Sequence, residues 1–330
     1  MRTVRAGSYQ RLASQEALWA AWRQCRRGKR RSAAVARFDI DCDQHLLALQ
    51  RALLRGCYRP APWRLHVIRD PKTRLIAAPA VRDRVLHHAV LTEIGPVFER
   101  RFLDQSFAAG PGRGPHRAAL YLLACQRRYA WRLHLDIHAY FLSISHSRLL
   151  ALFAARLVDA ETLELLRLLI AASEQVYQSP LAAAALGARC PAPGWGLPLG
   201  SWLSQWCGNM YLDGVDHYIK RQLKIPGYAR YMDDLVLFAD APAQLLAART
   251  AVAAWLQQER QLQLNPKHLT VESTRTPAVV LGYRLSRAGL SPSRKLRRHL
   301  RQRLCSAAAA GEAALVRSIR SYRGLLLFPH

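Results

Sequence analysis

The chain has 330 residues, 51% of them hydrophobic, so it can form roughly two or three subdomains with cores of their own and is not a disordered protein. Its 49 Lys and Arg residues outnumber 22 Asp and Glu residues, and the net charge of +27 predicts a polyanionic partner, most often nucleic acid. It has no apolar run of about 18 residues, and the N-terminus lacks the apolar segment of a signal peptide, so we expect a cytoplasmic protein that does not cross a membrane. Seven scattered cysteines without a C-x-x-C pair argue against a disulfide framework and a zinc site.

The N-terminal third is predicted to be mainly helical with one pair of strands. Apolar residues at helical spacing predict helices at 9–25, 43–56 and 82–103. Shorter apolar runs predict strands at 63–68 and 74–78, joined by a turn at 69–73. A basic run after the first helix includes Arg30 and Arg31 and is either a solvated loop or a contact for phosphate groups.

The remainder alternates helices with few strands, which indicates an α+β core. The glycine-rich loop at 107–116 lacks the pattern of a phosphate-binding loop. Helices are expected at 117–128, 146–175, from 203 to 219 and at 242–260, with an irregular stretch at 176–195. Strands are expected at 131–136, at 227–231 with 235–239, at 262–264 and at 279–283, and the tail from 290 is strongly basic.

Two adjacent carboxylates, Asp233 and Asp234, are the most informative feature. Apolar runs on both sides predict a β-hairpin with the pair at its tip. Adjacent carboxylates repel each other unless a cation is shared, so the pair is either a solvated turn or part of a divalent-metal site. If Asp136, which ends the strand at 131–136, lies in the same sheet, three carboxylates converge. Such a set suits two Mg²⁺ ions that promote phosphoryl transfer, with Mn²⁺ as the alternative.

Segments in chain order resemble the motifs of reverse transcriptases. Leu135–Ile144 resembles the first catalytic strand, and Tyr231–Asp234 with the strand after it resembles the catalytic hairpin. Gly196–Gln205 resembles the segment that contacts template and incoming nucleotide. Leu262–Lys267 and Val280–Tyr283 resemble the two later palm motifs. A single motif of this kind is weak evidence, whereas the ordered set is specific.

The resemblance implies a right-hand polymerase, bacterial or phage-encoded, that copies RNA into DNA. Its expected partners are template RNA, dNTPs and the cDNA product, but not a membrane. The parts it implies are N-terminal helices and fingers at 1–118, palm at 119–151 and 196–285, a helical insertion at 152–195, and a short basic thumb at 286–330.

The resemblance also implies roles for individual residues. Asp136, Asp233 and Asp234 would bind the metal ions together with the carbonyl of Ile137, and Lys267 would protonate the leaving pyrophosphate unless it is simply solvated. Phe141 would select deoxynucleotides by clashing with a ribose 2′-hydroxyl, and Gln205 either lies near the base pair or caps a helix. The residues expected around the nucleotide are Lys72, Arg74, Arg82, Phe141, Leu199, Gly200, Gln205, Tyr231 and Met232. Those expected on nucleic acid are Arg30, Arg31, Ser204, Arg294, Lys295 and Arg298.

Gly200–Gln205 narrows the resemblance, because it is similar to the G-x-x-x-S-Q pattern of diversity-generating retroelements and of related antiphage-defence lineages. Most reverse transcriptases carry Gln before this glycine, whereas this chain carries Leu199, and an aliphatic residue there accompanies error-prone copying in the retroelement enzymes. We therefore expect low fidelity, a dedicated noncoding RNA as template and a small basic accessory protein. A defence enzyme copying its own noncoding RNA and a catalytically silent RNA-binding scaffold are the alternatives.

Overall fold

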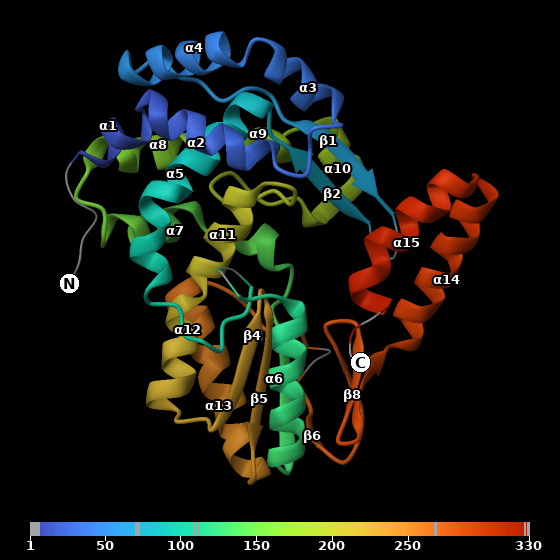
Figure 1. Cartoon of the computed structure of the whole chain (residues 1–330). Helices are drawn as coiled ribbons and strands as arrows, with labels where there is room; N and C mark the ends of the chain where they lie inside the picture. Colours follow the sequence, from blue (N-terminus) through green and yellow to red (C-terminus); the bar gives the residue numbers. More distant parts are fainter. Residues whose placement is uncertain are drawn as a thin grey trace. The chain divides into compact units, whose positions relative to one another are not determined.

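A computed structural model describes residues 7–69, 73–108, 110, 112–266, 269–326 and 328. Helices and small antiparallel sheets make up the described chain, which confirms the predicted α+β class (Figure 1). The chain divides into two compact units. The first comprises the residues up to Phe102, His138–Gly214 and Trp255–Gln263, and the second comprises Leu103–Ile137, Val215–Ala254 and the residues from Leu264.

The first unit consists of helices and one β-hairpin. The hairpin pairs β1 (Arg64–Ile68) with β2 (Arg74–Ala78), which confirms both predicted strands; part of the turn between them lies outside the described residues. The helices are α1 (Ser8–Leu12), α2 (Gln15–Arg26), α3 (Ala33–Ile40), α4 (Cys42–Leu54), α5 (Val81–Glu99), α7 (His146–Ala154), α8 (Ala160–Ala171), α9 (Glu174–Tyr177), α10 (Pro180–Leu186) and α11 (Trp202–Tyr211).

Capping residues divide some helices that we expected to be continuous. The helix predicted at 9–25 breaks because the Ser14 side chain accepts a hydrogen bond from the Ala17 amide and starts α2. The helix predicted at 146–175 is three helices, and Asp159 caps the second of them. The stretch at 176–195 is not wholly irregular, because Ser179 caps α10 and Pro180 occupies its first turn. Helix α3 was not predicted.

The second unit contains a sheet with the strand order β4-β5-β3-β6 and a smaller sheet with the order β7-β8-β9. The strands are β3 (Trp131–Asp136), β4 (Gly227–Tyr231), β5 (Asp234–Ala239), β6 (Val271–Ser273), β7 (Ala278–Val280), β8 (Tyr283–Ser286) and β9 (Gly289–Pro292). The helices that lie wholly or largely in this unit are α6 (Pro115–Arg128), α12 (Asp213–His217), α13 (Pro242–Trp255), α14 (Arg294–Ala309) and α15 (Glu312–Leu326).

Helix α6 packs on β4 and β5, and its Leu122 joins Phe238 and Tyr129 in the buried core of the second unit (Figure 1). Strands β3, β4 and β5 match the predicted runs closely because β3 alternates and β4 and β5 are largely apolar. Two other strand predictions were wrong. The run at 279–283 is interrupted by a turn in which Leu281 has a φ of 52°, and Leu264 forms only an isolated bridge to Ile137.

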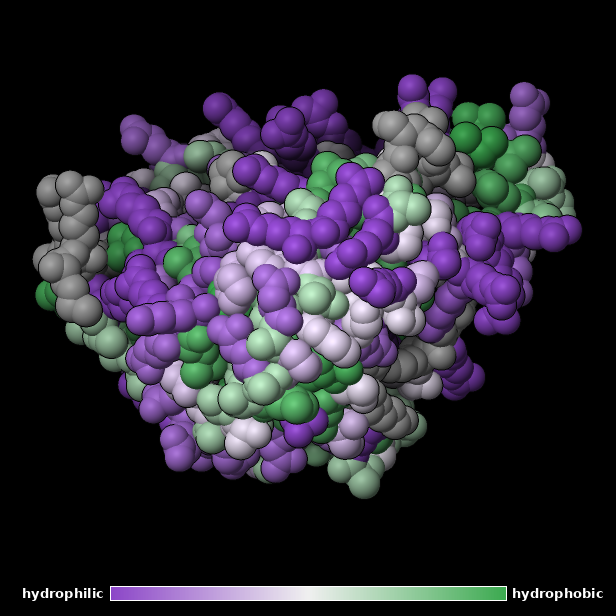
Figure 2. All heavy atoms as spheres, turned by 90° about the horizontal axis from the view of Figure 1, so that it is seen from below, coloured by the Kyte–Doolittle hydropathy of each residue, from purple (hydrophilic) through white to green (hydrophobic). Residues whose placement is uncertain are grey.

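Hydrophilic side chains cover much of the face seen in Figure 2, as the excess of basic residues leads one to expect. In the part of the chain that the structure describes, none of the helices is both long and apolar enough to cross a bilayer.

Candidate active site

Two neighbouring strands of the second unit bring carboxylates together. Strands β3 and β5 are antiparallel, and their register places Asp136 directly opposite Asp234. The pair before them, Leu135 and Leu235, is fully buried and fixes this register, because a slip by one residue would expose it. Residues opposed in this way have Cβ atoms about 4.5–5.5 Å apart. The prediction that Asp136 lies in the same sheet as the hairpin is therefore confirmed.

The hairpin between β4 and β5 closes through a two-residue turn, Met232 and Asp233, with Tyr231 paired to Asp234. Met232 has a φ of 56°, in the left-handed region that glycine adopts more readily. A positive φ matches the twist of a tight hairpin but costs a methionine on the order of 1 kcal/mol. Strain of this kind persists only where the surroundings fix the backbone.

A buried arginine fixes that turn. Arg230, on β4, is fully buried, and its Nη1 donates a hydrogen bond to the Met232 carbonyl at 3.1 Å. Its Nε and Nη2 form a two-point ion pair with Asp216, at 2.7 and 2.6 Å. Ser106 accepts a further bond from Nη2, and the Tyr228 hydroxyl donates to Asp216 at 2.6 Å. Burial, followed by the charge of Asp216, raises the pKa of Tyr228 well above its usual value, so the hydroxyl stays a donor.

Each of the two opposed carboxylates also has a polar neighbour. Asn265 Nδ2 donates to Asp136 Oδ2 at 2.7 Å, and the Asn265 amide donates to the Asp136 carbonyl at 2.8 Å. His134 Nε2 lies 2.8 Å from Asp234 Oδ1. These contacts engage one carboxylate oxygen of each aspartate and orient both groups.

The pair of Asp136 and Asp234 fits a hard divalent cation, because like charges directly opposite repel and carboxylate oxygens are the ligands that Mg²⁺ prefers. Among the residues that the structure describes, no three His, Cys, Asp or Glu side chains are placed to hold a metal ion together. Asp233 lies in the turn and Ile137 is buried one residue beyond β3, so their parts in metal binding stay predictions.

The predicted template-contact segment belongs to the first unit, where it lies against β2. The Ala77 amide donates to the Leu199 carbonyl at 2.7 Å, and Leu199 bridges to Ile76. Gly200 has a φ of 113°, and a Cβ there would come within 2.6 Å of the Ala77 carbonyl oxygen. Only glycine therefore fits at position 200.

Farther along this segment, Ser201 rather than Gln205 caps α11, since its hydroxyl accepts from the Ser204 amide. The Ser204 side chain is buried and Gln205 is exposed. Phe141, in the short 3₁₀ helix Tyr140–Ser143, is half-buried, and a Cβ on Gly208 would lie 3.1 Å from its ring. Phe141 thus packs on a helix position that has no side chain.

The predicted cations differ in their surroundings. Arg82 is engaged within the fold: it donates to Asp83 and to the Arg59 carbonyl, and its guanidinium lies 5.3 Å from the centroid of the Tyr58 ring. Arg74 is exposed at the start of β2. The exposed cations of the basic run and of α14 include Arg30, Arg31, Arg294, Lys295 and Arg298. Lys72 and Lys267 lie outside the described residues.

Residues 69–285 match the family model for reverse transcriptase (RNA-dependent DNA polymerase). The chain belongs to the reverse transcriptase family. As a member of this family it is an RNA-directed DNA polymerase, and the match begins before β2 and ends within β8.

Protein YkfC of Escherichia coli K12 is 27% identical to this reverse transcriptase over 281 residues, 73% of this chain and 71% of YkfC. A 91 kDa protein in the cob intron of Schizosaccharomyces pombe is 26% identical over 142 residues, which cover 42% of this chain and 16% of that protein. A solved structure of apo telomerase from Candida tropicalis, truncated from the C-terminal domain, is 8% identical in sequence to this chain. The match covers 74% of this chain and 59% of the telomerase chain. Its TM-score is 0.48, and at that level the overlap carries no conclusion.

Sequence reasoning missed the residues that support the carboxylates. Asn265 lies inside the later palm motif Leu262–Lys267, but the resemblance suggested no role for its side chain. Arg230 and Asp216 were also missed, although an arginine inside an otherwise apolar strand is a signal, because charged residues are rarely fully buried unless paired.

Proposed function

We propose that this chain extends a DNA strand on an RNA template by metal-assisted nucleotidyl transfer at Asp136 and Asp234, with Asp233 beside them in the turn. The observation that carries the proposal is the register of β3 and β5, which sets two carboxylates opposite each other at the end of a rigid hairpin. Paired carboxylates on neighbouring strands are a favourable arrangement for holding the cations of phosphoryl transfer.

In this proposal the protein's own groups bind and orient. Asp136 and Asp234 hold the cation, Mg²⁺ by preference and Mn²⁺ as the alternative, while Asn265 and His134 orient the two carboxylates. Arg230 holds the carbonyl of the turn. The bound cation supplies Lewis acidity at the phosphoryl oxygens. The family resemblance alone suggests three further parts of this proposal. These are a second metal ion, the Ile137 carbonyl as a metal ligand, and Lys267 as the proton donor to pyrophosphate.

Primer extension tests it. Purified wild type with an RNA template, a DNA primer, dNTPs and Mg²⁺ is expected to make cDNA. The variants Asp136→Asn and Asp234→Asn are each expected to make no cDNA while they still bind RNA. Asp104→Asn is the matched control, since Asp104 is exposed in the same unit and should leave synthesis unchanged. Absence of product from wild type, with RNA binding intact, would favour the silent scaffold.

We further propose that the biological setting is a diversity-generating retroelement with low fidelity. Leu199 supports this, because an aliphatic residue at that position accompanies error-prone copying in the retroelement enzymes that the segment resembles. Loss of a polar contact to the base pair is the physical cause that we expect. Leu199→Gln should lower the error rate at template adenines, which sequencing of the cDNA measures. Equal error rates in both proteins would contradict the proposed low fidelity.

In a retroelement, a dedicated RNA and an accessory protein should co-purify with the chain. An untranslated RNA that is copied in response to phage would instead favour the antiphage-defence enzyme.

A further inference from the structure

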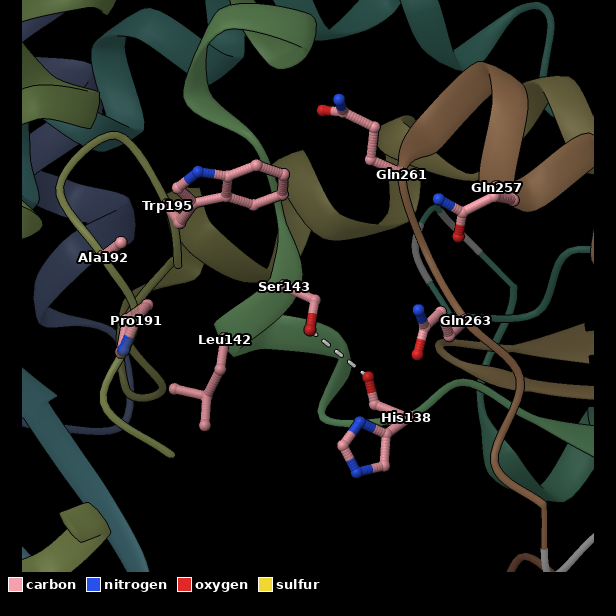
Figure 3. Close-up of a pocket in the computed structure, with 9 residues that line it drawn as sticks. All are labelled: His138, Leu142, Ser143, Pro191, Ala192, Trp195, Gln257, Gln261 and Gln263. Carbon is pink, nitrogen blue, oxygen red and sulfur yellow. Dashed lines mark hydrogen bonds between the residues drawn. The ribbon is translucent and has the colours of Figure 1, made fainter. Parts of the chain in front are cut away.

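A cavity of about 330 Å³ has all of its described lining residues in the first unit, and Asp136 and Asp234 are not among them (Figure 3). Its polar and aromatic lining consists of Trp195, His138, Ser143, Gln257, Gln261 and Gln263. Ligand pockets span roughly 300–1,000 Å³, so a cavity of this size suits one ring system rather than a stretch of nucleic acid.

The lining carries neither acidic side chains nor Lys or Arg among the residues that the structure describes. This is unexpected in a chain with a net charge of +27. Among the described lining residues, a phosphate group would meet no Lys or Arg and a free ammonium group no carboxylate. The described lining therefore favours a neutral group that forms ordinary hydrogen bonds.

Trp195 supplies a flat apolar wall. The indole is half-buried, and no other aromatic ring of the described chain stacks on it. Its backbone is held firmly: Trp195 bridges to Ser145, its amide donates to the Ala192 carbonyl, and the next amide, that of Gly196, donates to Ile144. A backbone held in this way positions the indole in the cavity wall, and an aromatic ring there can stack on a base.

Three glutamine amides come from the opposite wall (Figure 3). Gln257 lies on the π-helical turn Leu256–Arg260, and Gln261 follows it with a φ of 55°, in the left-handed region. Gln263 holds the start of the neighbouring segment, because its carbonyl accepts from the His138 amide at 2.8 Å. All three side chains are exposed and have no hydrogen-bond partner in the described chain. π-Helical turns and left-handed non-glycine residues both occur preferentially at functional sites.

We propose that this cavity binds one unpaired nucleobase, which stacks on Trp195 and offers its edge to the glutamine amides. A primary amide has an acceptor oxygen and donor N–H groups side by side, and this pair matches N6 and N7 of adenine. An amide can also pair with an edge of the other bases, so the preference for adenine over uracil rests on its larger ring, which covers more of the Trp195 indole. The base can come from a free nucleoside or from an unpaired position of an RNA strand, since both offer the same ring and the same edge. Nucleic acid is expected near this chain because it belongs to the reverse transcriptase family.

Adenosine is the first probe, because it carries the base without phosphates and so does not bind the basic surface through charge. Saturation-transfer NMR and titration of the full chain should show binding that is tighter for adenosine than for uridine. Trp195→Leu should weaken binding roughly 5- to 100-fold, in line with the usual contribution of base stacking. Trp195→Phe keeps a ring and should retain most of the affinity. Gln263→Leu should weaken binding several-fold, whereas Gln258→Leu should not, because Gln258 is exposed on the same π-helical turn but does not line the cavity.

A short oligouridylate with one central adenosine, compared with all-uridine RNA, distinguishes the sources. Displacement of adenosine by the mixed strand alone supports a strand-borne base, and displacement only by nucleosides supports a free ligand. The inference is overturned if wild type binds neither adenosine nor the mixed strand in preference to all-uridine RNA, or if folded Trp195→Leu binds as wild type does. Primer extension on the same preparations keeps the proposals apart: synthesis without adenosine binding overturns only this one.

Discussion

The β4–β5 hairpin and the Leu199–Trp202 segment are held in place by opposite kinds of groups. Behind the hairpin lies a fully buried ion pair, Arg230 with Asp216. Behind the segment lie two histidines of α5: His87 Nδ1 is 3.4 Å from the Ser201 hydroxyl, and the His88 ring stacks on Trp202 at 4.5 Å. The first support depends on charges that must stay paired, and the second depends on imidazoles that must stay neutral.

Burial is the reason for that neutrality. It lowers the pKa of His87 to about 3, with a further contribution from His88. Burial, then Lys29 and Arg84, lowers the pKa of His88 to about 4. The two regions should therefore respond differently to mutation and to pH.

Breaking the buried ion pair should have the largest effect on stability. Asp216→Asn leaves the Arg230 charge buried and unpaired, and the expected loss is about 3–5 kcal/mol of unfolding free energy. Urea unfolding measures this loss. Glu93→Gln is the matched control, because the side chains of its pair with Arg11 are 50% and 23% exposed and the pair should contribute less than about 1 kcal/mol. Similar losses in both variants would show that burial does not set the difference.

A side chain at Gly200, which lies against the main chain of β2, should cause the next largest loss of stability. Gly200→Ala adds a methyl group 2.6 Å from the Ala77 carbonyl oxygen at a φ of 113°. The clash and the backbone strain together should cost roughly 2–4 kcal/mol. Gly56→Ala is the control: its φ is also positive, at 65°, but no atom lies within 4 Å of the added carbon, so only the strain remains. Equal costs at both positions would show that β2 moves aside.

Lowering the pH should weaken the first unit through His87. The folded-state pKa is below the unfolded value of about 6.5, so unfolding takes up a proton between these values and stability falls as the pH drops. The slope is about 1.4 kcal/mol per pH unit, or roughly 2 kcal/mol between pH 7 and pH 5. His88 should add less, because part of its ring meets solvent. Urea midpoints against pH should show a shallower slope for His87→Gln than for wild type, and an unchanged slope would remove His87 as the cause.

Local patterns in the sequence predict the strands around the carboxylates, whereas the buried contacts behind them are long-range. Strand β3 and the hairpin were predicted closely because period-two alternation and a polar break are local signals. The facing of Asp136 and Asp234 followed once both strands were placed in one sheet. The pairing of Arg230 with Asp216 depends on a long-range contact that no local pattern encodes. The turn at Leu281 was missed because apolar residues continue through it.

Substitution of the turn residue Met232 should cause the smallest change in stability. Asparagine tolerates the left-handed region better than methionine, so Met232→Asn should stabilise the chain by several tenths of a kcal/mol, with Met232→Ala near zero. Thermal unfolding of the three proteins measures the differences. If asparagine gives no gain, the Arg230 bond to the Met232 carbonyl, rather than the side chain at 232, sets the backbone there. In that case Asp216→Asn should also loosen the hairpin itself, seen as faster hydrogen exchange of the β4 and β5 amides, with β1 and β2 of the first unit unchanged.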